Sequence, residues 1–162
     1  KVTLGELIHD ENFGGGMRNN NTLQAIIPGG SSSKVLKAGE TFKIGDDELA
    51  LLDVPYDFDT LLKIDTMSGS GAIIVIDDTR DIVECLANLA KFYAHESCGQ
   101  CTPCRVGCEK AVKLMSEAEW NEKLLNELSQ AMTDASICGL GQAAANPLKM
   151  VLAHFADDII CK

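Results

Sequence analysis

Four cysteines in one short segment are the residues of this chain best suited to bind a metal. The segment ESCGQCTPCRVGC (96–108) places Cys98, Cys101, Cys104 and Cys108 at spacings of two, two and three intervening residues. A loop with the spacing C-x-x-C-x-x-C can direct three thiolates at adjacent corners of a four-iron cluster, and the fourth corner then needs a ligand from elsewhere. The spacing therefore favours an iron–sulfur cluster bound by Cys98, Cys101 and Cys104.

Zinc is the main alternative, because structural zinc sites are also built from cysteines. Those sites usually take two cysteine pairs separated by a longer stretch, whereas here three cysteines are evenly spaced with a fourth nearby. The chain has seven cysteines, an odd number that does not favour the disulfide framework of a short secreted protein. Redox-active thiols or a disulfide form the third interpretation, and reduced thiolates that hold a metal are preferred over it.

Cys108 and Cys138 are the two candidates for the fourth ligand. Cys108 completes the spacing of bacterial ferredoxins, but Glu109 stands where those proteins have proline. In two-cluster ferredoxins that last cysteine binds the other cluster. Cys138 lies in ASICGLGQAAANP, which we expect to form a loop between two helices where the backbone can approach a cluster closely. Loop position and small neighbours favour Cys138, while the spacing alone leaves both candidates open.

Several other residues near the motif have ordinary structural explanations. His95 stands at an expected helix end, where capping is the default role and a contact toward the cluster is the alternative. Arg105 either offsets the negative charge of a thiolate-bound cluster or faces solvent. We expect Cys85 and Cys161 to be small hydrophobic residues and not ligands. The G-x-G at 69–71 precedes a strand, so it indicates a tight turn and not a dinucleotide site.

The composition describes an acidic, foldable chain. Of its 162 residues 46% are hydrophobic, which is enough for a packed core, and the net charge is −10. This charge repels phosphates, so we expect protein partners and no nucleic acid. No apolar run approaches the roughly 20 residues of a spanning helix, so no direct membrane insertion is expected. The chain begins without Met and without a signal peptide, which indicates a processed chain or part of something longer.

Residues 1–78 are expected to combine short strands with few helices. Thr3 and Glu6 match the capping box of a short helix that begins after Thr3. Alternating and apolar runs predict strands at 23–27, 35–36, 48–52 and a buried one at 71–76, with a brief helix at 57–64. Small strands around a helix favour a β-grasp-like module.

Residues 79–162 are expected to form a four-helix bundle, which makes the fold class α+β. Thr79 or Asp81 would cap the first helix, and a boundary between the two parts is expected near 77–78. The second helix should begin just after Cys104 and end near 116, and the third should cover about 119–133. Asn146 followed by Pro147 opens the fourth helix, which should run to 155.

The cysteine segments resemble a known family. FYAHESCGQCTPCR (92–105) and SICGLGQAAANPL (136–148) are similar to the NADH-oxidising flavoprotein subunit of respiratory complex I, a subunit type that recurs in NAD-dependent hydrogenases and formate dehydrogenases. The similarity continues upstream at 14–36, 52–61 and 69–78, and so covers essentially the whole chain.

The resemblance implies a site and a function. It implies a soluble-ligand-binding β-grasp module at 1–78 and one [4Fe-4S] cluster at 79–162, bound by Cys98, Cys101, Cys104 and Cys138. The cluster would relay electrons from flavin to iron–sulfur partner subunits, in a peripheral arm on the cytoplasmic or mitochondrial matrix side. FMN and NAD(H) would bind in a Gly-rich section expected before residue 1 or on a separate chain. The isolated chain is then not expected to oxidise NADH, although the parent subunit would be part of an NADH dehydrogenase.

Two departures from the family pattern stand close to the site. Val106-Gly107 follows the Cys-Arg pair where family members commonly have Glu then Gly. Cys108 stands where the family usually has a residue without sulfur. A binding module with a four-cysteine zinc site is the alternative function from another class.

Overall fold

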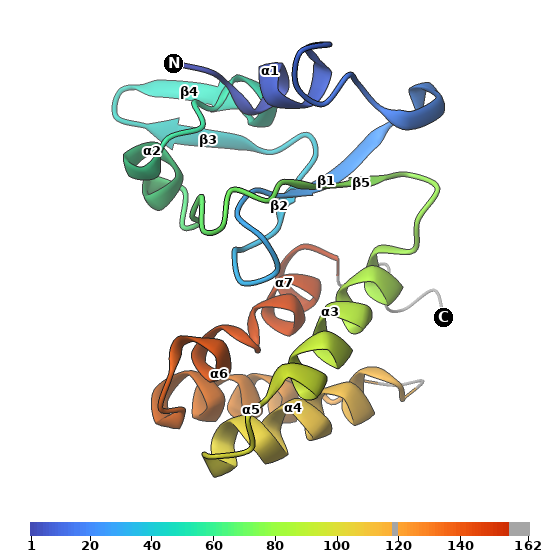
Figure 1. Cartoon of the computed structure of the whole chain (residues 1–162), viewed down its shortest axis with the longest axis vertical. Helices are drawn as coiled ribbons and strands as arrows, with labels where there is room; N and C mark the ends of the chain where they lie inside the picture. Colours follow the sequence, from blue (N-terminus) through green and yellow to red (C-terminus); the bar gives the residue numbers. More distant parts are fainter. Residues whose placement is uncertain (118–119, 156–162) are drawn as a thin grey trace. The chain divides into compact units, whose positions relative to one another are not determined.

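A computed structural model describes residues 1–117 and 120–155 of the chain. By internal contacts the chain divides into two compact units, Lys1–Arg80 and Asp81–Lys162. The division lies close to the boundary expected at 77–78, and the turn there is closed by the hydrogen bond from Arg80 N to Asp77 O, 3.1 Å long. Together the units contain both a small sheet and several helices, so the fold class is α+β (Figure 1).

The first unit contains two short helices, two 3-10 turns and five strands. In chain order they are α1 (Leu4–His9), η1 (Arg18–Asn20), β1 (Leu23–Ile27), β2 (Leu36–Lys37), β3 (Thr41–Ile44), β4 (Asp47–Ala50), η2 (Leu51–Asp53), α2 (Phe58–Lys63) and β5 (Ile74–Asp77). Strand β1 is the centre of an antiparallel sheet with the order β2-β1-β5, and β3 and β4 form a separate hairpin. The core of this unit gathers around fully buried apolar side chains, among them Leu4, Ile26, Val54 and Leu61.

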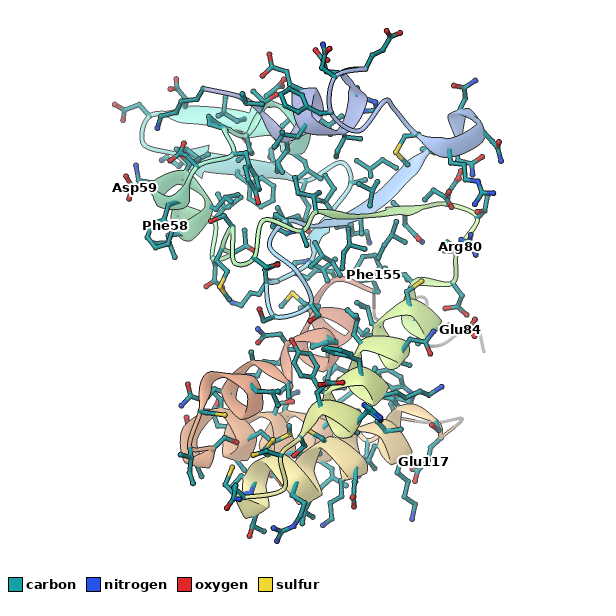
Figure 2. The ribbon with its side chains drawn as sticks, viewed as in Figure 1. Phe58, Asp59, Arg80, Glu84, Glu117 and Phe155 are labelled. Atoms are coloured by element: carbon teal, nitrogen blue, oxygen red, sulfur yellow. The ribbon has the colours of Figure 1, made fainter. Side chains whose placement is uncertain are left out.

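Local sequence signals explain several of these elements. The capping box is confirmed, since Thr3 Oγ1 accepts from Glu6 N at 3.1 Å and Glu6 Oε2 accepts from Thr3 N at 2.8 Å. The strand expected at 23–27 is β1, and the brief helix expected at 57–64 is α2 with Asp57 as its cap. Figure 2 shows Phe58 and Asp59 at the start of α2, where Phe58 is 64% exposed.

One strand of the first unit was missed, and one expectation for this unit was wrong. Strand β3 was not predicted, because TFKI mixes Lys with apolar residues and is short. The strand expected to be buried at 71–76 is β5 at Ile74–Asp77, where Ile74 is 37% and Val75 38% exposed. An apolar run predicts a strand but not its depth, because burial depends on what covers the sheet. The β-grasp description of this unit stays a prediction.

The second unit is helical. It contains α3 (Ile82–Glu96), α4 (Thr102–Met115), α5 (Glu122–Ala135), α6 (Gly139–Ala143) and α7 (Asn146–His154). Asp81 caps α3 by accepting from Glu84 N at 3.0 Å, and Asn121 caps α5 by accepting from Leu124 N at 3.0 Å. No helix in the described ranges has the length and apolar character needed to span a membrane.

Two helix expectations for this unit need correction. The second helix begins at Thr102, so Cys104 lies in its first turn and not before it. Pro103 fits this start, because the first helical turn leaves backbone N–H groups without partners and proline has none to lose. The Gly- and Ala-rich segment expected as a loop contains α6, so the described residues of this unit hold five helices and the four-helix description is not confirmed. The expected start of the third helix near 119 lies outside the described residues.

Candidate metal centre

The loop between α3 and α4 is shaped by a cap and a glycine. Helix α3 ends where Ser97 N donates to Tyr93 O at 3.1 Å. Gly99 then turns the chain with φ +77°, a conformation that costs glycine little. Arg105 donates to the Gly99 carbonyl and so braces the turn from the first helical turn of α4. The cysteines on either side of Gly99 are thereby held on one tight bend.

The segment around α6 approaches this bend through small residues. Cys138 is the N-cap residue of α6. A Cβ built on Gly141 would lie 2.6 Å from Ser136 Cβ and 2.9 Å from Cys104 Cβ, closer than real Cβ contacts. Only a residue without a side chain therefore lets α6 pack this tightly against the start of α4.

All four cysteines of the predicted ligand set line one cavity. The cavity has a volume of about 120 Å³ and is lined by Glu96, Ser97, Cys98, Gln100, Cys101, Cys104, Cys138 and Leu140. Figure 2 draws sulfur atoms in yellow, and several gather near the start of α4. Cys108 is not part of this lining. Of the two candidates for the fourth ligand, the fold thus brings Cys138 to the three loop cysteines.

The cysteines differ in exposure. Cys104 is 4% exposed and Cys101 is half-buried, whereas Cys98 and Cys138 are exposed. The cavity therefore has a buried side at α4 and an open side at Cys98 and Cys138. A group bound there would be reached from solvent past those two residues.

Hydrogen bonds and burial shift the pKa values of two of the thiols in opposite directions. The backbone N–H of Ile137 lowers the pKa of Cys101 below its ordinary value of 9.0, because it stabilises the thiolate. Burial, with the nearby Cys104 thiolate, raises the pKa of Cys108 to about 12. Cys101 is thus prepared for the thiolate form that metals bind, and Cys108 is not.

The donor set fits an iron–sulfur cluster. The cavity, at about 120 Å³, has room for more than one water molecule, each of which needs roughly 10–15 Å³ on the same measure. Ser136 Oγ is buried without a hydrogen-bond partner among the described residues, so an acceptor such as a cluster sulfur would satisfy it. In the ranges 1–117 and 120–155, no three His, Cys, Asp or Glu residues are grouped closely enough for a single metal ion.

His95, Cys85 and Arg105, which the sequence also singled out, do not line the cavity. His95 is an exposed residue of the last turn of α3, where Nδ1 lies 3.1 Å from Glu96 Oε1. Cys85 lies on α3 and is half-buried. Cys161 lies outside the described residues. Arg105 faces solvent and braces the loop.

Sequence reasoning missed two residues that the fold brings to the site. Ser97 Oγ lies 3.3 Å from Cys104 Sγ, a contact that the sequence did not predict. The sequence also did not single out Ser136, whose buried hydroxyl stands beside Gly141. The only available signal for Ser136 was its place two residues before Cys138.

A larger groove exists in the first unit. It measures about 400 Å³ and is lined by Leu7, Ile8, Gly14, Gly16, Met17, Arg18, Ile73, Val75 and Asp77. Hydrogen bonds from Thr79 and Asn21 lower the pKa of Asp77, so this carboxylate is already engaged within the fold. The groove contains none of the residues predicted to do chemistry.

Comparisons with known proteins agree with the cysteine geometry. Residues 84–162 match a family profile described as the NADH-ubiquinone oxidoreductase-F iron-sulfur binding region. The F subunit of the NADH-quinone oxidoreductase of Rickettsia akari is 39% identical over 166 residues, which cover 98% of this chain and 36% of that protein. The resemblance predicted from the cysteine motifs is confirmed.

A mitochondrial relative and a solved structure extend the similarity. The NADH-ubiquinone oxidoreductase 51 kDa subunit of Aspergillus niger is 37% identical over 98% of this chain and 31% of its own length. A crystal structure of an NAD+-reducing [NiFe]-hydrogenase in the H2-reduced state superposes with a TM-score of 0.78 at 29% identity. The match covers 99% of this chain and 25% of that one. The chain thus spans about a third of the length of the two sequence relatives, and an iron–sulfur cluster is the cofactor that the similarity supports.

Proposed function

We propose that this chain is the iron–sulfur relay section of an NADH-oxidising flavoprotein subunit. It would accept electrons from flavin bound outside residues 1–162 and pass them to iron–sulfur centres of partner subunits. The single observation that carries the proposal is the cavity lined by Cys98, Cys101, Cys104 and Cys138, in a segment that matches an iron–sulfur binding region. These four cysteines are the proposed ligands of one [4Fe-4S] cluster.

The protein contributes three things to such a site. The bend at Gly99 and the close packing at Gly141 hold the thiols from two distant segments around one cavity. The Ile137 N–H stabilises the Cys101 thiolate, Ser97 Oγ lies within hydrogen-bond reach of Cys104 Sγ, and the unpaired Ser136 hydroxyl would be available to a sulfur of a bound cluster. Donors to sulfur of this kind tune the reduction potential. A bound cluster would supply the one-electron chemistry, because its irons change oxidation state by one electron.

The parent subunit, its other cofactors and its assembly are inferred from the relatives as part of this proposal. The relatives are named as subunits of NADH-quinone and NADH-ubiquinone oxidoreductases. FMN and NAD(H) would bind in another section of the parent subunit or on a separate chain, and the assembly would lie in a peripheral arm on the cytoplasmic or matrix side. The first unit would be the β-grasp module of the same subunit. Residues 1–162 alone should then give no NADH turnover with an artificial acceptor, and flavin-dependent activity would contradict this expectation.

Metal analysis of anaerobically prepared protein tests the proposal. We expect about four irons and four sulfides per chain, together with a paramagnetic resonance signal after reduction. One zinc per chain without iron would instead support the alternative of a four-cysteine zinc site. Fully titratable thiols without any metal would refute both.

Two single substitutions test the ligand assignment. Cys138→Ala should lower iron and sulfide content and change the resonance signal, because it removes a thiol from the cavity. Cys108→Ala is the matched control, since Cys108 is also a cysteine of the second unit but does not line the cavity. Loss of iron in the control with full iron in Cys138→Ala would show that the assignment is wrong.

A further inference from the structure

Cys108 is a buried thiol that the proposed ligand set leaves without a role. It lies on α4 one helical turn after Cys104, and its Sγ is 4.0 Å from Cys104 Sγ. It is 2% exposed and packs in a cluster with Tyr93, Met132 and Ala144. Burial alone is ordinary for a free cysteine, so it is the contact with the Cys104 sulfur that points to a role directed at that sulfur.

A disulfide between the two sulfurs does not fit this position. Residues four apart on a helix hold their Cβ atoms about 5–6 Å apart. A disulfide needs Cβ atoms about 3.5–4.5 Å apart, so α4 would have to unwind to form one. The contact is therefore one between two unbonded sulfur atoms.

The direction of a hydrogen bond between these sulfurs follows from the chemistry of the ligand. A cysteine that binds iron does so as a thiolate and has no proton to donate. A cysteine that binds no metal ordinarily keeps its proton at neutral pH. Between Cys104 and Cys108 only Cys108 can then be the donor, and Ser97 Oγ at 3.3 Å is a second donor to the same sulfur.

We propose that Cys108 donates an S–H hydrogen bond to the Cys104 ligand sulfur and thereby raises the reduction potential of the bound cluster. The inference rests on the proposed function, because it requires a cluster bound through Cys104. Reduction adds negative charge that spreads onto the ligand sulfurs, so a donor stabilises the reduced state more than the oxidised state. The contact is buried, where water does not screen it, so its effect is larger than at a surface.

Redox titration of the full chain with its cluster tests this inference. The variants are Cys108→Ala, which removes the thiol, and Cys108→Val, which fills the same buried space without a donor. Cys85→Ala is the control, because Cys85 is also a helical cysteine of this unit but does not line the cavity. Iron and sulfide content, the resonance signal and the midpoint potential are measured for each protein.

Both Cys108 variants should keep their iron and sulfide and shift to a lower midpoint potential. At the ambient potential that half-reduces the parent cluster, their ratio of reduced to oxidised cluster should fall about threefold to tenfold, where tenfold is 59 mV for one electron. Cys85→Ala should titrate like the parent protein.

The possible outcomes distinguish failure of the Cys108 donor role from failure of the proposed iron–sulfur function. Full iron in both Cys108 variants with an unchanged midpoint potential would refute the donor role alone. Loss of iron in both variants, with full iron in Cys85→Ala, would also refute it, since Cys108 would then be a ligand or a packing requirement. A parent protein without iron would refute the proposed function, and the donor role with it.

Discussion

Adding one methyl group at Gly141 should separate α6 from the start of α4 and so disturb the cysteine cavity. A Cβ at this position would lie 2.6 Å from both Cβ and Oγ of Ser136 and 2.9 Å from Cys104 Cβ. Ordinary contacts of this kind begin at 3.4 Å, so the neighbours must move by roughly 0.5 to 0.8 Å. Neither Cβ atom can move without its backbone. Gly141→Ala should therefore displace α6 from the start of α4, and Cys138 from the other cavity cysteines.

The expected cost combines two opposing effects. Overpacking a tight contact destabilises a protein by about 1–3 kcal/mol. Replacing glycine by alanine within a helix returns about 0.5–1 kcal/mol. Gly141→Ala should lower the free energy of unfolding by about 1 to 2 kcal/mol.

Gly139 provides the matched control, because it lies on the same short helix and a Cβ there would meet nothing within 4 Å. Gly139→Ala should leave the free energy of unfolding unchanged or slightly higher. Its iron content should equal that of the parent protein. Urea unfolding and iron analysis of both variants measure the difference. Equal stability and equal iron content in the two variants would refute the reasoning, because they would show that α6 does not pack against Cys104 as described.

Three further predictions concern stability and are measured by urea unfolding. Leu125→Ala should lower the free energy of unfolding by about 2–5 kcal/mol, because Leu125 is fully buried. Leu124→Ala should lower it far less, because Leu124 is 44% exposed. Equal losses of stability would contradict the buried face described for α5. Thr3→Ala should cost about 1 kcal/mol through loss of the α1 cap, and Thr3→Ser should largely keep it. A hydrogen bond from Lys1 lowers the pKa of Asp57 from 3.8 to about 2. The stabilisation from this carboxylate is thus full above about pH 4 and is lost as pH falls toward 2. The stability difference between the parent and Asp57→Asn should shrink over that window, and a constant difference would contradict the ion pair.

Local signals explain how much of the fold was predictable. Thr3 and Asp57 are caps whose side-chain oxygens bind backbone N–H groups within three residues, so nearby sequence is sufficient to predict α1 and α2. The short strand β3 and the helix α6 were missed because their residues have weak preferences that tertiary packing overrides. The depth of β5 was wrong for the same reason, since a hydrophobic run does not say what covers it.

The sequence by itself determined which chemistry this protein can support. Three cysteines at a regular spacing on one bend predict metal binding, because a loop with this spacing can direct its thiols at a common centre. From the net charge of −10 and the lack of a long apolar run, the sequence predicts protein partners and neither nucleic acid nor membrane insertion, and this stays a prediction. Both conclusions depend only on residues that are neighbours in the chain or on the chain as a whole.

Spacing alone left Cys108 and Cys138 open and the resemblance implied Cys138, whereas the tertiary structure shows that Cys138 lines the cavity with those three and Cys108 does not. Helical geometry carries Cys108 about 6 Å further along α4 than Cys104, since each residue advances about 1.5 Å, and the packing there buries it. Cys138 is distant in sequence but returns to the bend because Gly141 lets α6 approach the start of α4. Closeness in sequence and closeness in space differ here because a rigid helix separates its residues along one axis, while a glycine contact between helices brings distant segments together.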